Sequence, residues 1–130
     1  MRYFTLFFLF QVYLVNAQVS LTDSTICERL DFISKQKISN SLLSFIKTQD
    51  SLGKCDLKLI NFSGDSIIEF DVSVQYGAEL RSIICHGNKL SKAIYLVMPS
   101  TVKTIYIGSI IVKSKNGTTH RIEDGSLIIE

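Results

Sequence analysis

The chain has 130 residues, of which 46% are hydrophobic and 20% are charged, and its formal net charge at pH 7 is +2. This length suits one domain, and the hydrophobic content is enough for a packed core, which argues against an intrinsically disordered chain. The small net charge argues against a nucleic-acid-binding role.

The first residues have the pattern of a secretory signal peptide. Arg2 precedes a mostly apolar run over residues 4–15, and Val15-Asn16-Ala17 resembles a signal-peptidase site. The run is shorter than the roughly 20 apolar residues that a membrane-spanning helix needs. We therefore expect cleavage between Ala17 and Gln18. This would export residues 18–130 as a single small domain, to the periplasm or the extracellular medium, without a stable membrane anchor.

Residues 25–49 have the apolar spacing of a helix, either one bent helix or two short ones. Apolar residues recur every three or four positions at Ile26, Leu30 and Ile33, and again, after a slip in phase at residues 35–37, at Ile38, Leu42 and Phe45 or Ile46. Thr25 and Glu28 predict a capping box at the start of this helical region. Gly53 predicts its end.

After Gly53 the apolar period changes to two, which predicts strands. Strands are expected at residues 56–62, 67–76 and 80–86, with a turn at 63–65. The pattern is clearest over residues 67–76, where apolar and polar side chains alternate as in a half-buried antiparallel strand.

Residues 89–98 fit either a helix or a strand. A helix capped by Asn88 would end before Pro99, and we favour it over a strand through residues 93–98.

The C-terminal part predicts further strands and turns. Residues 104–115 are rich in β-branched side chains, and Gly108 predicts a bulge. Asn116-Gly117 predicts a type I′ hairpin turn, and Asp124-Gly125 predicts another turn before the last strand. The expected fold is α+β: an N-terminal helix or broken helix packed on a twisted antiparallel sheet of about five or six strands, with a second short helix.

The hairpin over residues 67–86 has two plausible registers, which differ in the placement of Cys85 and His86. A two-residue Gly77-Ala78 loop in a type II′ turn places Cys85 beside Phe70 on the core face and His86 beside Glu69 on the polar face. A three-residue loop exchanges the two faces. The turn residues favour the first register. In both, adjacent side chains point to opposite faces, so Cys85 and His86 do not form a catalytic pair or chelate one metal.

The mature chain would keep three cysteines, Cys27, Cys55 and Cys85. An odd number permits one internal disulfide, or a free thiol that pairs with another chain. A straight helix rises about 1.5 Å per residue and would hold Cys27 far from Cys55. Because a bridge needs Cα atoms within about 7 Å, we expect a Cys27–Cys55 disulfide only if the helix is broken. We expect Cys85 to be a buried small hydrophobic residue.

No catalytic, cofactor-binding or metal-binding motif is predicted. The chain has no HExxH, paired CxxC, glycine-rich phosphate loop or GxSxG sequence. Glu69, Asp71 and Glu79 lie on one hairpin, in a pattern more typical of a solvated strand face than of acid–base catalysis. The last hairpin is basic, which is typical of a protected sheet edge, and its basic residues are Lys113, Lys115, His120 and Arg121.

One stretch resembles a known family. SIIEFDVSVQYGAELRSIICHG at 66–87, followed by LSKAIYLVMP at 90–99, is similar to the strand–turn–strand–helix–Pro pattern of TonB C-terminal-like domains. The matching positions are Val72, Val74, Leu80, Ala93 and Met98-Pro99.

The stretch departs from the family pattern in three ways. Ala78 replaces the usual turn glycine, no proline-bearing segment precedes the first strand, and the tail after Pro99 is longer. The resemblance implies a related fold more than a related role. The family binds outer-membrane transporters by strand addition and usually has a membrane anchor and a spacer, and cleavage after Ala17 would leave this chain with neither.

We expect a small exported, non-enzymatic domain that binds a protein partner through a sheet edge, without a cofactor or metal. The alternatives are a cystatin-like protease inhibitor, a small secreted hydrolase, or a structural protein linked to another chain by its odd thiol. The cystatin Gln-x-Val-x-Gly loop is absent, since residues 75–79 keep only Gln75 and a displaced Gly77.

Overall fold

The structure, a computed structural model, describes residues 22–129. Its helices are α2 (Asp23–Ser34), the 3-10 turn η1 (Ser91–Ala93) and α3 (Ile94–Val97). Its strands are β1 (Leu43–Gln49), β2 (Cys55–Asn61), β3 (Ser66–Tyr76), β4 (Glu79–His86), β5 (Thr104–Lys113), β6 (Thr119–Ile122) and β7 (Gly125–Ile128). The expected signal peptide and its Ala17–Gln18 cleavage site lie outside the described residues.

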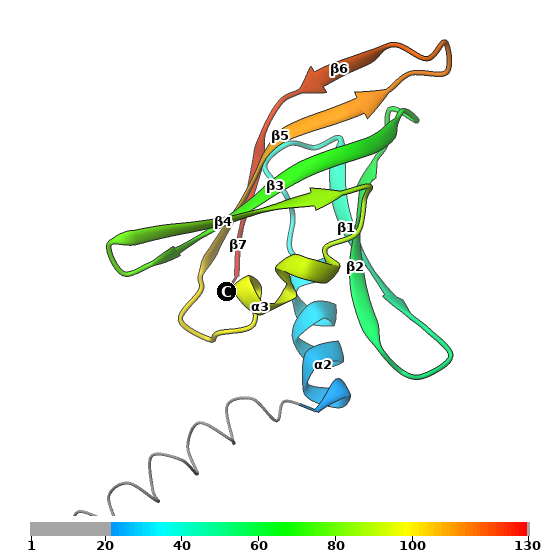
Figure 1. Ribbon diagram of the computed structural model, residues 1–130. Coiled ribbons are helices and arrows are strands. Elements are labelled where there is room, and N and C mark those ends of the chain that lie inside the picture. The colour runs from blue at the N-terminus through cyan, green and yellow to red at the C-terminus, as the bar shows by residue number, and fades with distance from the viewer. Residues whose placement is uncertain (1–21, 130) are drawn as a thin grey trace, which may run out of the picture.

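The strands form two antiparallel sheets within the described part of the chain. The larger has the order β4-β3-β5-β6, and β7 also pairs with β5. Residues 110–113 of β5 pair with β6 and residues 104–107 pair with β7, so β6 and β7 form one interrupted edge strand. The smaller sheet is the β1–β2 hairpin. The predicted α+β fold is confirmed (Figure 1).

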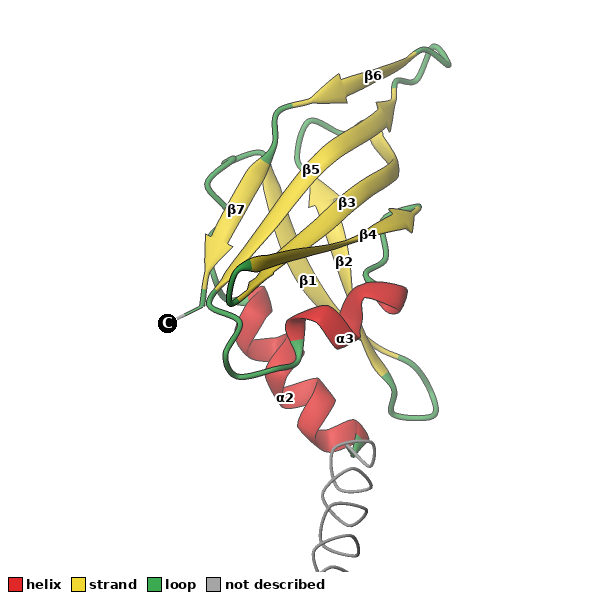
Figure 2. Cartoon of the chain, turned by 60° about the vertical axis from the view of Figure 1, so that its left-hand side comes forward, coloured by secondary structure: helices red, strands yellow, loops and turns green. Residues whose placement is uncertain are grey.

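The core lies between the larger sheet and a layer made of α2, α3 and the β1–β2 hairpin (Figure 2). Alternate β3 side chains, Phe70, Val72 and Val74, are fully buried in it, as the period-two pattern predicted. Leu30 and Ile33 of α2 are buried against the same core. Each such side chain contributes about 1.5–3 kcal/mol through burial.

The second half of the predicted helical region is a strand, so that part of the prediction is wrong. Residues 43–49 pair with β2 along their whole length, and the buried side chains are Leu43 and Phe45. These two have a period of two, whereas Leu42 and Ile46, which fitted the helical spacing, are exposed. Pairing with a strand that follows along the chain overrides the local helical pattern.

Two predicted helix signals also have other roles. The N-cap of α2 is Thr22, whose side chain accepts a hydrogen bond from the Thr25 backbone N–H at 3.2 Å, so the predicted capping box from Thr25 to Glu28 is wrong. Gly53 lies in the β1–β2 loop at a φ of +83°, and it ends no helix. Its freedom to adopt positive φ serves the hairpin instead.

The short helix before Pro99 is present as η1 and α3, as the favoured alternative predicted, but its N-cap is Leu90 without a side-chain hydrogen bond, so the predicted cap at Asn88 is wrong. Arg29 of α2 fastens it to the rest of the molecule. The guanidinium donates to the backbone carbonyls of Val97, Pro99 and Val102 at 3.1–3.3 Å. These carbonyls lie at and beyond the end of α3, where a helix leaves acceptors without internal partners.

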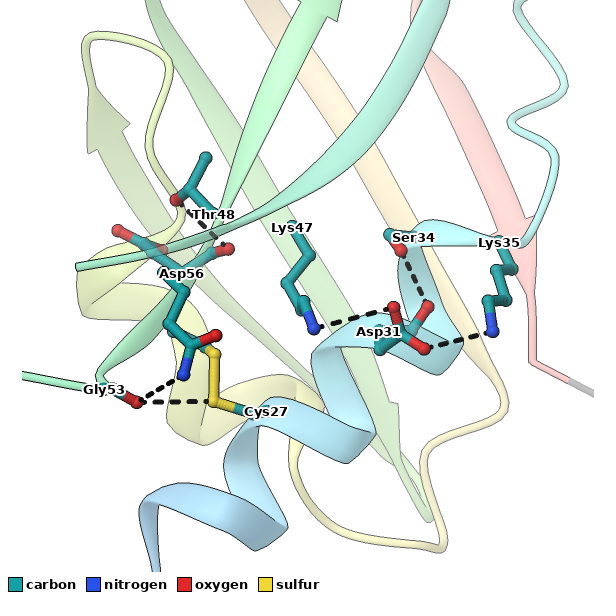
Figure 3. A network of polar contacts seen from close by, with 10 residues as sticks. Cys27, Asp31, Ser34, Lys35, Lys47, Thr48, Gly53 and Asp56 are labelled. Carbon is teal, nitrogen blue, oxygen red and sulfur yellow. Dashed lines mark hydrogen bonds and ion pairs between the residues drawn. A yellow bond between two sulfur atoms is a disulfide. The ribbon is translucent and has the colours of Figure 1, made fainter. Parts of the chain in front are cut away.

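A disulfide joins Cys27 of α2 to Cys55 at the start of β2, with a Cα–Cα distance of 5.2 Å (Figure 3). The sequence allowed this bridge only for a broken helix, and the helix does end at Ser34.

Asp31, one turn after Cys27, pairs with Lys35 at 3.1 Å and with Lys47 of β1 at 3.8 Å (Figure 3). The hydrogen bond from Lys35 is the main cause of the lowered pKa of Asp31.

One turn and one β-bulge differ in detail from their predictions. The β5–β6 hairpin closes with Gly117 N–H donating to the Ser114 carbonyl and Ser114 N–H donating to the Thr118 carbonyl. Only Gly117 in this turn has a positive φ, so the turn is a three-residue loop rather than a type I′ turn. The bulge predicted at Gly108 lies at Ser109, which has a φ of +47°.

Candidate functional site

The β3–β4 hairpin has the register predicted from its turn residues. Tyr76 pairs with Glu79, and the Gly77-Ala78 loop has a positive φ at Gly77 alone, as in a type II′ turn. Phe70 consequently lies opposite Cys85, and Glu69 lies opposite His86.

Cys85 is a buried thiol with low reactivity. Its residue is only 3% exposed, and among the described cysteines it is the one outside the disulfide. Burial raises the pKa of the thiol to about 11, with smaller contributions from the negative charges of Asp56 and Asp71. A thiol is nucleophilic as the thiolate, so Cys85 is unsuited to catalysis or to covalent assembly of the folded chain.

The other predicted candidates do not converge. His86 is exposed on the opposite face from Cys85, with Nδ1 3.7 Å from Oε2 of Glu69. Glu79 pairs with Arg81 at 3.6 Å near the tip of the hairpin. Among residues 22–129, no group of three or more His, Cys, Asp or Glu side chains is arranged to hold a metal ion.

The outer face of the larger sheet is uncovered by any described element. It contains a hollow of about 440 Å³ whose lining includes Asp71, Tyr106 and Asp124. The Asp124 carboxylate lies over Gly108, where an added Cβ would meet it at 3.4 Å. Asp124 also faces Arg121 at 3.5 Å. The hollow therefore brings Asp71 into one depression with a second carboxylate, which the sequence did not predict.

The β4 strand has a free hydrogen-bonding edge. In an antiparallel pair with a two-residue loop, hydrogen-bonded pairs alternate with non-hydrogen-bonded ones. The hydrogen bond from Gly87 N–H to the Ile68 carbonyl, at 2.5 Å, fixes this alternation. The N–H and C=O groups of Leu80, Ser82 and Ile84 therefore point away from β3. Within the described residues no hydrogen bond reaches them.

The side chains along this edge are unusually apolar for an exposed strand. Leu80 is 59% exposed and Ile84 is 56% exposed, and both lie on the outer face of the sheet. Ser82 lies between them and shares a hydrogen bond of 2.6 Å with Ser73. The Arg81 guanidinium lies 4.5 Å from the centre of the Tyr76 ring, on the other face. The hairpin extends beyond the rest of the sheet (Figure 1).

Other sheet edges are covered or protected. Residues 88–90 cover β2, with Leu59 N–H donating to the Asn88 carbonyl at 2.7 Å. Residues 38–40 cover β7, with Ser39 N–H donating to the Ser126 carbonyl at 2.8 Å. Lys47 lies in the middle of β1, and charged side chains on an edge disfavour strand pairing.

The short β6 strand belongs to the basic hairpin. Its exposed residues include His120 and Arg121, and His120 Nε2 lies 3.7 Å from Asp65 Oδ2. Lys113 and Lys115 of the same hairpin are exposed. With four residues and these charges, β6 is less suited than β4 to accept another strand.

A group of lysines lies beside the C-terminal end of β4. Lys89 pairs directly with Lys58 of β2, an arrangement in which like charges repel. Lys89 and Lys92 line a pocket of about 190 Å³ together with Cys85 and His86. None of the three lysines forms an ion pair with a described carboxylate.

The nearby carboxylate of Asp56 forms hydrogen bonds within the chain and pairs with none of these lysines. It accepts hydrogen bonds from Ser91 Oγ and from the Leu57 N–H. No pattern in the sequence predicts the lysine group, because the group depends on the pairing of residues 88–90 with β2.

Comparison of the chain with protein-family models, curated proteins and solved structures finds no match. In the described part of the chain, no helix has the length and hydropathy needed to cross a membrane.

Proposed function

We propose that this chain is a small exported, non-enzymatic domain that binds a segment of protein by strand addition at the β4 edge. The observation that carries the proposal is the row of backbone groups at Leu80, Ser82 and Ile84, which have no hydrogen-bond partner in the described chain. A strand added there would satisfy these groups, and the exposed Leu80 and Ile84 would contact its side chains.

Export is supported by the signal-like N-terminal sequence and by the Cys27–Cys55 disulfide, which suits an oxidising compartment. The succession of β3, β4 and α3 before Pro99 supports the resemblance to TonB C-terminal-like domains. Partner binding by strand addition in that family agrees with the proposal.

The alternatives have less support. A hydrolase would use the hollow at Asp71 and Asp124, but this hollow is an open depression and Asp124 already faces Arg121. A covalently linked structural protein would need an accessible Cys85, and this residue is buried. A cystatin-like inhibitor would need a binding loop that the sequence at residues 75–79 lacks.

Photo-crosslinking in the native host tests the proposal. A benzoylphenylalanine placed at Leu80 should form a covalent adduct with a protein in the exported fraction, because its exposed side chain lies along the free edge. The same group at Thr119 of β6 is the matched control, since this residue is also exposed on an edge strand. Adducts are detected as mass-shifted bands on denaturing gels and identified by mass spectrometry.

The expected result is an adduct from Leu80 but not from Thr119. No adduct from Leu80, or equal yields from both positions, would contradict strand addition at β4.

A further inference from the structure

The free edge of β4 is complementary to a second copy of itself. Its free backbone groups belong to Leu80, Ser82 and Ile84, which are spaced by two and centred on Ser82. A two-fold axis through Ser82 would pair two β4 strands antiparallel, with Ser82 opposite Ser82 and Leu80 opposite Ile84 of the second copy. In this register each free N–H of one copy faces a free C=O of the other. The pairs formed by Leu80, Ser82 and Ile84 are therefore the hydrogen-bonded ones.

The same register pairs the exposed apolar side chains. Leu80 and Ile84 lie on the outer face, where no described element covers them. The two-fold places each of them beside the other residue of the second copy, so two Leu–Ile cross-strand contacts form. Such directly opposed apolar pairs stabilise a sheet.

The charges at the ends of the strand also match. In the register centred on Ser82, Glu79 of the second copy lies opposite Cys85, on the inner face. Cys85 lines the pocket that contains Lys89 and Lys92, which lack an ion-pair partner in the described chain. An incoming carboxylate there would supply the opposite charge that Lys89 and Lys92 lack.

His86 and the acidic groups near this pocket leave it available to that carboxylate. His86 faces Glu69 on the outer side of the sheet at 3.7 Å, and the carboxylate of Asp56 is held by Ser91 and the Leu57 N–H. Among the described residues, Glu79 itself forms an ion pair only with Arg81, at 3.6 Å. Because this pair is exposed to solvent, it contributes little stability, and Glu79 can leave it at a small free-energy cost.

From these three matches we infer that the protein forms an isologous dimer through antiparallel β4–β4 pairing centred on Ser82, with Glu79 of each copy entering the Lys89–Lys92 pocket of the other. The inference rests on the proposed function, because it names the occupant of the same edge. The dimer would join the two larger sheets into one continuous sheet.

Sedimentation equilibrium of the exported, oxidised chain tests the dimer, over a concentration range from about 1 μM to 1 mM, which covers the affinities common for small interfaces. Ser82→Pro removes an N–H that the folded monomer does not use, and it should raise the dimer dissociation constant at least about tenfold. Thr119→Pro on the β6 edge is the matched control. It should leave the dissociation constant unchanged.

A charge exchange tests the register. Glu79→Lys should weaken the dimer about tenfold or more, and adding Lys89→Glu and Lys92→Glu to it should restore the affinity to within about threefold of the original. A role of these residues in folding alone predicts no such rescue. Circular dichroism of each variant at low concentration checks that the monomer is folded.

The outcomes separate this inference from the proposed function. A chain that stays monomeric at every concentration would overturn the inference, and so would a dimer that persists in Ser82→Pro or a charge exchange without rescue. If the Leu80 crosslink then joins the chain to a different protein, strand addition at β4 still holds. A monomer that also gives no Leu80 adduct would contradict both.

Discussion

Removal of the Cys27–Cys55 disulfide should lower the free energy of unfolding by about 3–4 kcal/mol. The bridge closes a loop with a sequence separation of 28 residues, and a loop of that size restricts the unfolded chain considerably. It also ties α2 to the start of β2, so it holds together two elements of the layer that covers the larger sheet. Small domains are stable by about 5–15 kcal/mol, and the loss would be a large part of this.

The measurement is guanidinium unfolding of the chain with and without reductant, compared with Cys27→Ala/Cys55→Ala. Cys85→Ala is the matched control, because it removes the third cysteine but keeps the bridge, and it should remain sensitive to reductant. The double variant should be insensitive. A difference below about 1 kcal/mol between the oxidised and reduced chains would show that the bridge does not constrain the unfolded state as expected.

Titration of Cys85 should make the folded chain less stable in alkaline solution. Its pKa in the folded state is raised from 9.0 to about 11, so the folded state keeps the thiol proton at a pH where the unfolded state loses it. The contribution of the neutral thiol is therefore fully present below pH 9 and is lost as the pH rises from 9 towards 11. The full loss is about 2–3 kcal/mol at 1.36 kcal/mol per pKa unit.

This loss is measured as the difference in unfolding free energy between the wild type and Cys85→Ala at pH 8 and at pH 10.5. The other ionisable groups are the same in both chains, so the difference isolates the thiol. The difference in absorbance near 240 nm between the wild type and Cys85→Ala reports the pKa of the thiol in the folded chain, because tyrosinate, which absorbs at the same wavelength, is present in both chains. A thiolate midpoint at or below pH 9, or a pH-independent difference, would mean that Cys85 is more solvated than its burial indicates.

The sequence predicted the β3–β4 hairpin down to its register, because all of the local signals agreed there. Apolar residues alternate along β3, and Gly77 suits the first position of a type II′ turn. Those two facts place Cys85 in the core and His86 outside it. The same register places the side chains of Leu80 and Ile84 on the outer face of the sheet. The apolar side chains along the candidate edge could therefore have been predicted from the sequence.

Strand β1 was missed because its local pattern is ambiguous. Leu42, Phe45 and Ile46 fit a helical spacing, whereas Leu43 and Phe45 fit a strand, and only pairing with β2 decides between them. The lysine pocket was missed for a related reason. Lys58 and Lys89 meet only through the pairing of residues 88–90 with β2, a contact between segments that the sequence places far apart.

The most direct test of partner binding at the β4 edge is amide hydrogen exchange along β4 of the ¹⁵N-labelled chain, first in dilute buffer and then in the exported fraction of its own host. Strand addition at a free β4 edge predicts fast exchange in buffer at Leu80, Ser82 and Ile84 and slow exchange at Arg81 and Ile83, since only the latter two donate to β3. In the exported fraction, the three fast amides should become protected. Protection at another surface alone, or no change along β4, would contradict binding by strand addition at this edge.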